Sequence, residues 1–236
     1  LQFKMLSRQI TLAQLRENLT SFFTHELRSP LQSALSSIEM AEMYSEKKEV
    51  NSFLELSRNK VIYINKLIEK LLDINKLEKN KVNLIMERFL LKDSISQYLD
   101  HYFARTDKKI EIEALFSPEL SVYGDRVHIS NAIGNLIENA VKYSGESVNI
   151  KIFAEENSQD ITIIVEDNGI GIPPADQKRV FERFYRVNSA EHSKKGKGFG
   201  LGLNYVQWVA ISHKGGVRVE SEPGRGSKFI FTIRNK

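Results

Sequence analysis

The stretch "GKGFGLGL", residues 196–203, decides the fold of the larger part of the chain. Glycine stands at every second position, and the helical pattern "LNYVQWVAISH" begins within its last residues. Backbone N–H groups of a glycine-rich turn, together with a helix N-terminus, can hold an anion. Walker A and the dinucleotide fingerprint are both excluded by the spacing, since Leu and Asn follow Gly202. We therefore expect a phosphate-binding turn that opens a helix, and the immediate helix argues against a flexible linker.

Strands and helices alternate around this turn, from about residue 81 to the end of the chain. The ranges with strand patterning are 109–115, 149–155 and 160–167, with a hairpin at 214–235. The ranges with helical spacing are 91–104, 125–143 and 200–213. Mixed runs of both types predict an α/β sandwich domain over residues 81–236.

Residues 1–80 contain one proline and no glycine, and their apolar residues recur at helical spacing. Two helices are expected, joined by the polar turn "YSEKKEVN" at residues 44–51. Their apolar stripes are broad, so a hairpin of two helices leaves apolar surface uncovered. A second copy would cover it, which predicts a homodimer with a four-helix bundle. The fold class is therefore α+β, an antiparallel helical hairpin in a dimeric four-helix bundle followed by an α/β sandwich.

The composition of the 236 residues limits the classes of function. A net charge of +4 is too small to favour nucleic acid as a partner. No apolar run is long enough to cross a bilayer, so we expect no direct membrane contact in this fragment. The lack of cysteine excludes disulfides and thiolate metal sites, and it suits a reducing compartment such as the cytoplasm. The first residues already have a helical pattern, which suggests a piece of a longer protein.

The stretch "THELRSPL", residues 24–31, places a histidine on the polar side of its predicted helix. His25 lies about 170° from the centre of the apolar stripe, and Ser29 shares its face. An exposed histidine can attack a phosphoryl group if one ring nitrogen is unprotonated, and Glu26 could hold the proton of the other. Pro30 would kink the helix at this point. The alternative is an ordinary surface histidine beside a surface carboxylate.

The stretch "NLIENAVKY", residues 135–143, gathers polar side chains on one face of a helix. Asn135, Asn139 and Lys142 converge within about 60°, opposite the apolar face. Two amides and a lysine suit Mg²⁺ with phosphates, because Mg²⁺ takes oxygen ligands and keeps some of its water. A solvated polar face is the alternative.

The stretch "VEDNGIGIPP", residues 165–174, ends a strand on Asp167 and continues into a Gly-x-Gly turn. Gly169 and Gly171 permit positive φ and close approach of a ligand. A carboxylate at the end of a strand can accept a hydrogen bond from an exocyclic amine such as that of adenine. An ordinary tight turn is the alternative.

Together these stretches resemble the transmitter region of the sensor histidine kinases of two-component signalling. "THELRSPL" resembles the phosphoacceptor box of that family, "NLIENAVKY" its asparagine box and "DNGIGIP" its first glycine box. "FERFYRV", residues 181–187, resembles its phenylalanine box, and "GKGFGLGL" its second glycine box. The five motifs stand in the order of the family and cover essentially the whole chain. The resemblance implies a phosphotransfer and dimerisation domain over residues 1–80 and a GHKL-type ATP-binding domain over residues 81–236.

The resemblance also implies roles for single residues. His25 would be the phosphoacceptor with Glu26 as the base, Asp167 would bind the adenine amine, and Asn139 would bind Mg²⁺. Phe181 and Phe184 would anchor a mobile lid at residues 173–200. The remaining residues expected around ATP are Asn135, Lys142, Tyr143, Gly169, Gly171, Ile172, Phe184, Arg186, Lys197, Gly198, Phe199, Gly200, Leu201 and Gly202.

The implied activity is transfer of the γ-phosphoryl group of ATP to His25 and then to an aspartate of a response-regulator receiver domain. The family also implies a sensor domain upstream in the parent chain, with this fragment in the cytoplasm, as in the cytoplasmic part of a membrane-bound sensor. A catalytically silent ATP-binding adaptor and a GHKL-type ATPase are the alternatives. The intact motifs argue against the adaptor, and the helical hairpin with His25 argues against the ATPase.

Three positions depart from the expected pattern. Ser29 stands where the family commonly has Thr or Asn, which leaves phosphatase activity towards the regulator open. His128 and Asn131 stand ahead of the asparagine box, where Arg or Lys and Gln are more usual. We interpret those two as tuning the nucleotide pocket.

Overall fold

The structure is a computed structural model that describes residues 27, 29–43, 49–62, 64, 83–103, 108–188 and 200–236. The chain divides into two compact units, Leu1–Asn80 and Lys81–Lys236. No helix in the described ranges is long and apolar enough to cross a membrane.

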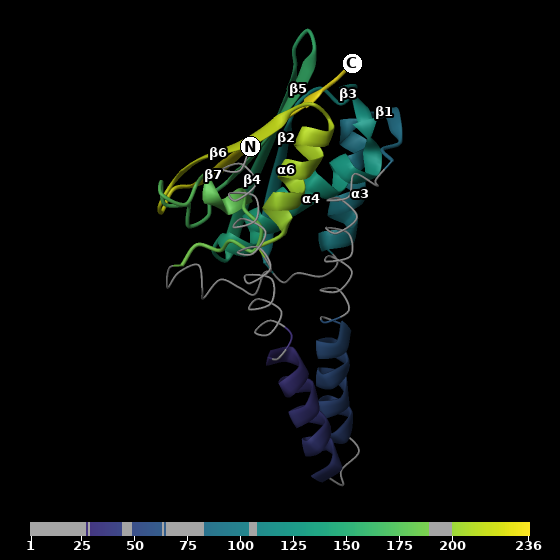
Figure 1. Cartoon of the computed structure of the whole chain (residues 1–236), viewed down its shortest axis with the longest axis vertical. Helices are drawn as coiled ribbons and strands as arrows, with labels where there is room; N and C mark the ends of the chain where they lie inside the picture. Colours follow the sequence, from purple (N-terminus) through teal and green to yellow (C-terminus); the bar gives the residue numbers. More distant parts are fainter. Residues whose placement is uncertain are drawn as a thin grey trace, which may run out of the picture. The chain divides into compact units, whose positions relative to one another are not determined.

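The first unit contains two helical segments, residues 29–43 and 49–62, which form the expected antiparallel hairpin (Figure 1). Small side chains line their contact, among them the buried Ala34, Ser37 and Ala41. Ser57 on the second segment is also buried, and its Oγ lies 3.1 Å from Ala34 O and 3.0 Å from Phe53 O. The buried residues of the described hairpin are all small, and most of its larger apolar side chains lie outside this contact.

Those larger apolar side chains are exposed on the described part of the hairpin. Leu31 is 54% exposed, Leu35 48% and Met43 84% on the first segment. Leu54 and Val61 on the second segment are each 47% exposed. The expectation that the hairpin leaves apolar surface uncovered is therefore confirmed.

The second unit is a mixed domain of strands and helices (Figure 1). Its strands are β1 (Met86–Leu90), β2 (Lys109–Leu115), β3 (Ser121–Asp125), β4 (Ser147–Glu156), β5 (Asp160–Asp167), β6 (Gly216–Glu222) and β7 (Gly226–Arg234). Its helices are α3 (Leu91–Phe103), α4 (Arg126–Tyr143), the short η1 (Arg179–Phe181) and α6 (Gly202–Ser212). The predicted strands and helices are confirmed, with helix ends shifted by one or two residues.

Five of the strands form one sheet in the order β2-β4-β5-β7-β6, in which only β2 and β4 are parallel. The other two, β1 and β3, pair antiparallel in a small separate sheet. Neither β1 nor β3 was predicted from the sequence. Each has five residues, and the exposed pattern of Met86–Leu90 lacks the alternation that marks a half-buried strand.

Helices α4 and α6 cover one face of the large sheet, and the core lies between them and the strands (Figure 1). On β5, alternate residues Ile161, Ile163 and Val165 are buried, as period-two patterning predicts. The opposite face carries charged residues, since Glu166 stands in register between Lys151 and Lys228. The same alternation that buries Val165 also buries Asp167, at the end of the strand.

Helix α4 is fixed at its N-terminus by Asp125. The Asp125 carboxylate accepts hydrogen bonds from His128 N at 3.0 Å and from Ile85 N at 2.8 Å. Asp125 N donates at 2.9 Å to Nε2 of the buried His213, whose Nδ1 lies 2.8 Å from Val209 O. Nδ1 therefore carries the proton, because a carbonyl oxygen only accepts. The neutral His213 ring thus joins the end of α6 to the start of α4.

Acidification is expected to destabilise this unit through His213. Burial lowers the pKa of His213 below its ordinary 6.5, although the Asp125 carboxylate opposes the shift. The stabilising contribution of the neutral ring is complete above about pH 6.5 and is lost as the pH falls below that value. Acidification from about pH 7 to pH 5 should therefore lower the urea midpoint of the wild type relative to that of His213→Gln. The variant lacks the His213 titration but keeps that of the buried Asp167, whose raised pKa acts in the opposite direction, so equal changes of the midpoint in both proteins would rule His213 out as a cause.

Candidate active site

Helices α4 and α6 bring the asparagine box and the second glycine box into contact. A Cβ added at Gly202 would lie 2.8 Å from Asn135 Oδ1. Asn135 Nδ2 donates to Asn131 O at 2.8 Å, which leaves Oδ1 directed to the start of α6. Gly202 is therefore small because the asparagine side chain occupies the adjoining space.

The C-terminal end of α4 contacts the first glycine box. Ile170 N donates to Tyr143 O at 3.1 Å, and a Cβ at Gly169 would lie 3.0 Å from the same oxygen. Lys142 Nζ lies over the Tyr143 ring, 4.7 Å from its centroid. The middle of α4 thus contacts the second glycine box, and the C-terminal end of α4 contacts the first.

Asp167 lies beside the second of these contacts, at Gly169, as a buried carboxylate. Its Oδ1 accepts a hydrogen bond from Gly169 N at 2.7 Å, and Ser227 N on the neighbouring strand also donates to the side chain. Burial raises the pKa of Asp167 from 3.8 to about 6, while the two backbone bonds lower it. A buried carboxylate that remains ionised near neutral pH is a strong acceptor for a donor on a ligand.

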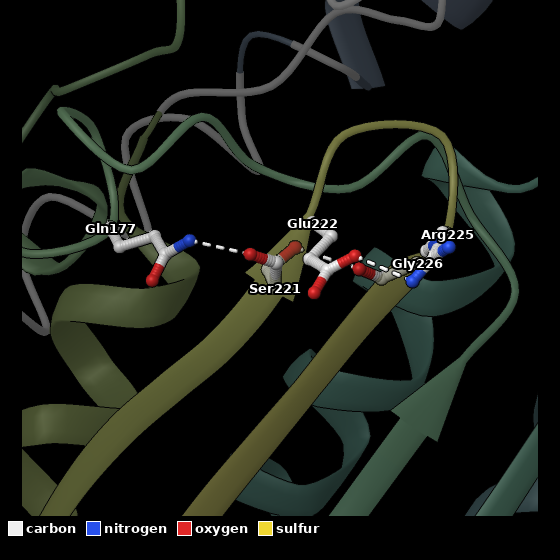
Figure 2. Close-up of polar contacts among 5 residues, drawn as sticks. All are labelled: Gln177, Ser221, Glu222, Arg225 and Gly226. Carbon is white, nitrogen blue, oxygen red and sulfur yellow. Dashed lines mark hydrogen bonds and ion pairs between the residues drawn. The ribbon is translucent and has the colours of Figure 1, made fainter.

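The β6–β7 hairpin, whose turn is shown in Figure 2, holds the first glycine box from the other side. Gly224 N donates to Ile170 O at 2.8 Å, and Ile172 N donates to Ser221 Oγ at 2.8 Å. Gly171 has a φ of 70°, and a Cβ at this residue would overlap the carbonyl of Glu222. Glycine is therefore required here for both its conformation and its size.

The phenylalanine box is tied to the start of α6. Phe181 is buried and meets Phe229 edge to face, with ring centroids 6.5 Å apart. Phe184 N donates to Gly200 O at 2.9 Å, and Phe184 itself has a positive φ of 61°. Asn204 on α6 accepts from Arg183 Nε at 3.2 Å and donates to Phe181 O at 3.0 Å.

The structure places most of the predicted site residues on these contacts. The half-buried ones on α4 are Asn135, Asn139, Lys142 and Tyr143, as the predicted polar face requires. Ile172 and Leu201 are buried, Phe184, Gly200 and Gly202 are half-buried, and Ser29 and Arg186 are exposed. The residues that lie outside the described ranges are His25, Glu26, Lys197, Gly198 and Phe199, with the rest of 189–199 in the predicted lid.

Three residues around Asp167 and Ile172 were not predicted. Ser227 pairs with Asp167 across β5 and β7, and Ser221 and Gln177 hydrogen-bond around Ile172. The pairing of the strand that ends on Asp167 with the "GRGS" strand could have indicated Ser227. Gln177 has no local signal, because one of its acceptors lies in a distant hairpin and the other is a backbone carbonyl.

The donor set on α4 fits Mg²⁺ in its chemistry. The described residues contain no group of three His, Cys, Asp or Glu side chains able to hold a metal ion. Asn135 and Asn139 offer amide oxygens on the half-buried polar face of α4. Mg²⁺ takes oxygen ligands and keeps several waters beside phosphate oxygens, so the two amide oxygens fit its ligand preference.

Models of known protein families match residues in both units. Residues 15–80 match the His Kinase A (phospho-acceptor) domain, and residues 124–236 match the Histidine kinase-, DNA gyrase B-, and HSP90-like ATPase family. The chain belongs to the sensor histidine kinases. The second unit is accordingly an ATP-binding domain.

Individual relatives agree with this assignment. The chain is 33% identical to sensor histidine kinase RppB of Synechocystis sp. over 94% of its own length, and it spans about half of RppB, 49%. Histidine kinase AdeS of Acinetobacter baumannii has a TM-score of 0.71 and 25% identity over 90% of this chain and 98% of the AdeS chain. Histidine kinase ThkA, solved in complex with response regulator protein TrrA, shares the fold with a TM-score of 0.75 and 22% identity, over 97% of this chain and 64% of that chain.

His128, one of the positions that depart from the family pattern, lies between α4 and α6. Its Nδ1 is 2.8 Å from Tyr205 OH, and its ring meets Trp208 edge to face at 5.2 Å. His128 therefore packs against α6 and helps to hold the two helices that carry Asn135 and Gly202.

Proposed function

We propose that the chain is an ATP-dependent protein histidine kinase that autophosphorylates on His25 and passes the phosphoryl group to an aspartate of a response regulator. The observation that supports this most strongly is the convergence on α4. Its middle adjoins Gly202 at Asn135, and its end adjoins Gly169 at Tyr143. The carboxylate of Asp167 lies beside that second contact.

In this proposal Asp167 accepts a hydrogen bond from the exocyclic amine of adenine. Gly169, Gly171 and Ile172 form the wall beside the base. The residues proposed to surround the ribose and phosphates are Asn135, Lys142, Tyr143, Phe184, Arg186, Lys197, Gly198, Phe199, Gly200, Leu201 and Gly202. The N-terminus of α6 adds the partial positive charge of a helix start to this end of the site.

Asn139, with Asn135 beside it, would hold Mg²⁺ through its side-chain oxygen. The ion, when bound, supplies charge neutralisation for the phosphate oxygens. Lys142 and the basic residues of the second glycine box add positive charge from the protein itself. The proposed contribution of the domain is therefore positioning of ATP and electrostatic stabilisation.

The proposed nucleophile is a ring nitrogen of His25, and ADP is the leaving group. Glu26 would accept the proton of the other ring nitrogen and so keep the attacking nitrogen unprotonated. Ser29, four residues after His25 in the sequence, is exposed at the start of the helical segment 29–43, and in this proposal it lies near the phosphoryl group. Whether it also supports dephosphorylation of a partner is a separate question, since the family commonly has Thr or Asn at this position.

The proposed partners are a second copy of the chain and a response-regulator receiver domain. The exposed apolar side chains of the hairpin, such as Leu35 and Leu54, would be buried in a four-helix bundle of two chains. ThkA was solved with a response regulator protein, which supports a partner of that class. A sensor domain elsewhere in the longer protein would supply the stimulus, and we expect the reaction to take place in the cytoplasm, where ATP is available.

The position of a radioactive phosphate in ATP distinguishes the proposed kinase from its two alternatives, a GHKL-type ATPase and a catalytically silent adaptor. A histidine kinase should retain radioactive label from the γ-phosphate on the protein and none from the α-phosphate. An ATPase would release the γ-label as free phosphate without retaining it. An adaptor would bind ATP and neither retain nor release label, and either of these results would contradict the proposal.

A further inference from the structure

Gln177 links two segments that meet at the first glycine box, and the proposed function gives it no role. Its Nε2 donates to Ile172 O at 3.1 Å and to Ser221 O at 2.7 Å. Figure 2 shows the side-chain nitrogen directed at the Ser221 carbonyl, beside the turn that carries the Glu222–Arg225 ion pair. Both acceptors are carbonyl oxygens, so both donor positions of the amide nitrogen are used.

The two carbonyls lie on different segments, one just after the first glycine box and the other on β6, and these segments meet at a junction. Ile172 continues the glycine box, and it is 8% exposed. Ser221 lies near the end of β6, and its Oγ accepts from Ile172 N at 2.8 Å and lies 2.7 Å from Gly226 O. Ile172 is thus bound to the hairpin through its own N–H and, by way of Gln177, through its carbonyl.

The backbone of Gln177 is itself held in place. Asp176 N donates to Pro173 O at 2.9 Å, and Arg179 N and Val180 N both donate to Asp176 O at 2.9 Å. The side chain of Asp176 accepts a hydrogen bond from Tyr185 OH. The amide of Gln177 therefore extends from a fixed turn, and its two bonds can fix what they reach.

From these contacts we infer that Gln177 is a positioning residue for the nucleotide, a role that rests on the proposed function. It acts through the backbone of Gly171 and Ile172, which it binds to the β6–β7 hairpin. That backbone follows closely on Gly169, whose N–H donates to Asp167. Gln177 therefore sets the wall of the adenine end of the site and touches none of the reacting atoms.

The test is Gln177→Met, which keeps the length of the side chain and removes both donors. Direct binding should show ATP and ADP weakened by the same factor, about three- to ten-fold, because the loss lies at the adenine end. Autophosphorylation should show a raised KM for ATP with kcat unchanged. Gln159→Met is the matched control, since Gln159 is exposed in the β4–β5 turn, and it should bind ATP like the wild type.

Ser221→Ala removes the acceptor of Ile172 N and tests the same junction from the hairpin side. It should weaken ATP binding by a similar factor. The double variant Gln177→Met/Ser221→Ala should lose less binding free energy than the sum of the two single variants, because both act on the same junction. If Gln177→Met does not fold, Ser221→Ala carries the test alone, with unfolding midpoints confirming that the protein studied is folded.

The outcomes separate this inference from the proposed function. Failure of the wild type to bind ATP would overturn the proposed function. Wild-type binding with unchanged affinities in both variants would overturn the role of Gln177 alone. Weaker binding of ATP with unchanged binding of ADP would also overturn it, because that pattern would place the effect at the phosphate end.

Discussion

Asp167→Asn will weaken ATP binding by about ten- to one-hundred-fold and remove most autophosphorylation, which is the loss expected for a hydrogen bond to a charged group. Gly169 N and Ser227 N already donate to this carboxylate, and an adenine amine would be a further donor. A carboxylate accepts from all of them, whereas an amide must point its NH₂ group at one donor. Isothermal titration with ATP measures the loss.

Glu166→Gln is the matched control for that substitution. Glu166 is the preceding residue of β5 and faces the opposite side of the sheet, in register with Lys151 and Lys228. The change from carboxylate to amide there should leave ATP affinity within about two-fold of the wild type. Equal effects of the two substitutions would show that net charge, rather than the position of Asp167, controls binding.

The same carboxylate should make ATP binding depend on pH. The pKa of Asp167 is raised to about 6, so the carboxylate is protonated below that pH and loses acceptor capacity. A bound amine favours the ionised form, so affinity should fall by up to about ten-fold per pH unit below pH 6. The ratio of wild-type to Asp167→Asn affinity isolates this effect from the titration of the ATP phosphates. A ratio that does not change between about pH 5 and pH 8 would contradict it.

Gly171→Ala will destabilise the ATP-binding domain by about 2–4 kcal/mol, from the left-handed backbone and the steric overlap together. Gly171 has a φ of 70°, and an added Cβ would overlap the carbonyl of Glu222. Relief of the overlap requires movement of the β6–β7 hairpin away from the glycine box. Urea unfolding, followed by circular dichroism, measures the change.

Gly145→Ala is the control for the glycine substitution. Gly145 follows the end of α4, has no left-handed φ, and has no atom within 4 Å of an added Cβ. Its free energy of unfolding should change by less than about 0.5 kcal/mol. Equal stabilities of the Gly171 and Gly145 variants would show that the Glu222 carbonyl leaves room for a Cβ at Gly171.

Local patterning was sufficient to predict the main strands and helices. On β4, Val148, Ile150 and Ile152 alternate with exposed residues, and that period is visible in the sequence. The small sheet of β1 and β3 has no such signal, because its strands are short and largely decided by their pairing with each other. Short strands of this kind depend on tertiary context more than on their own residues.

The site was predictable to the extent that it is made of contiguous motifs. Asn135, Asp167 and Gly202 could be chosen because each stands in a stretch whose residue types suit phosphate or base contact. Gln177 and His213 could not, since each depends on one distant partner, Ser221 at 44 residues and Asp125 at 88 residues in sequence. Contacts of that range are fixed by the packed fold, and the residues that make them have no distinctive neighbours.

The measurement that tests the central claim most directly is phosphate labelling of the wild type, His25→Gln and His101→Gln with γ-labelled ATP. The last variant is a matched histidine substitution in the ATP-binding domain. A phosphoryl group on a histidine nitrogen is lost in acid and retained in alkali. We predict label of this kind on the wild type and on His101→Gln, and none on His25→Gln. Label that persists on His25→Gln would contradict the assignment of the nucleophile.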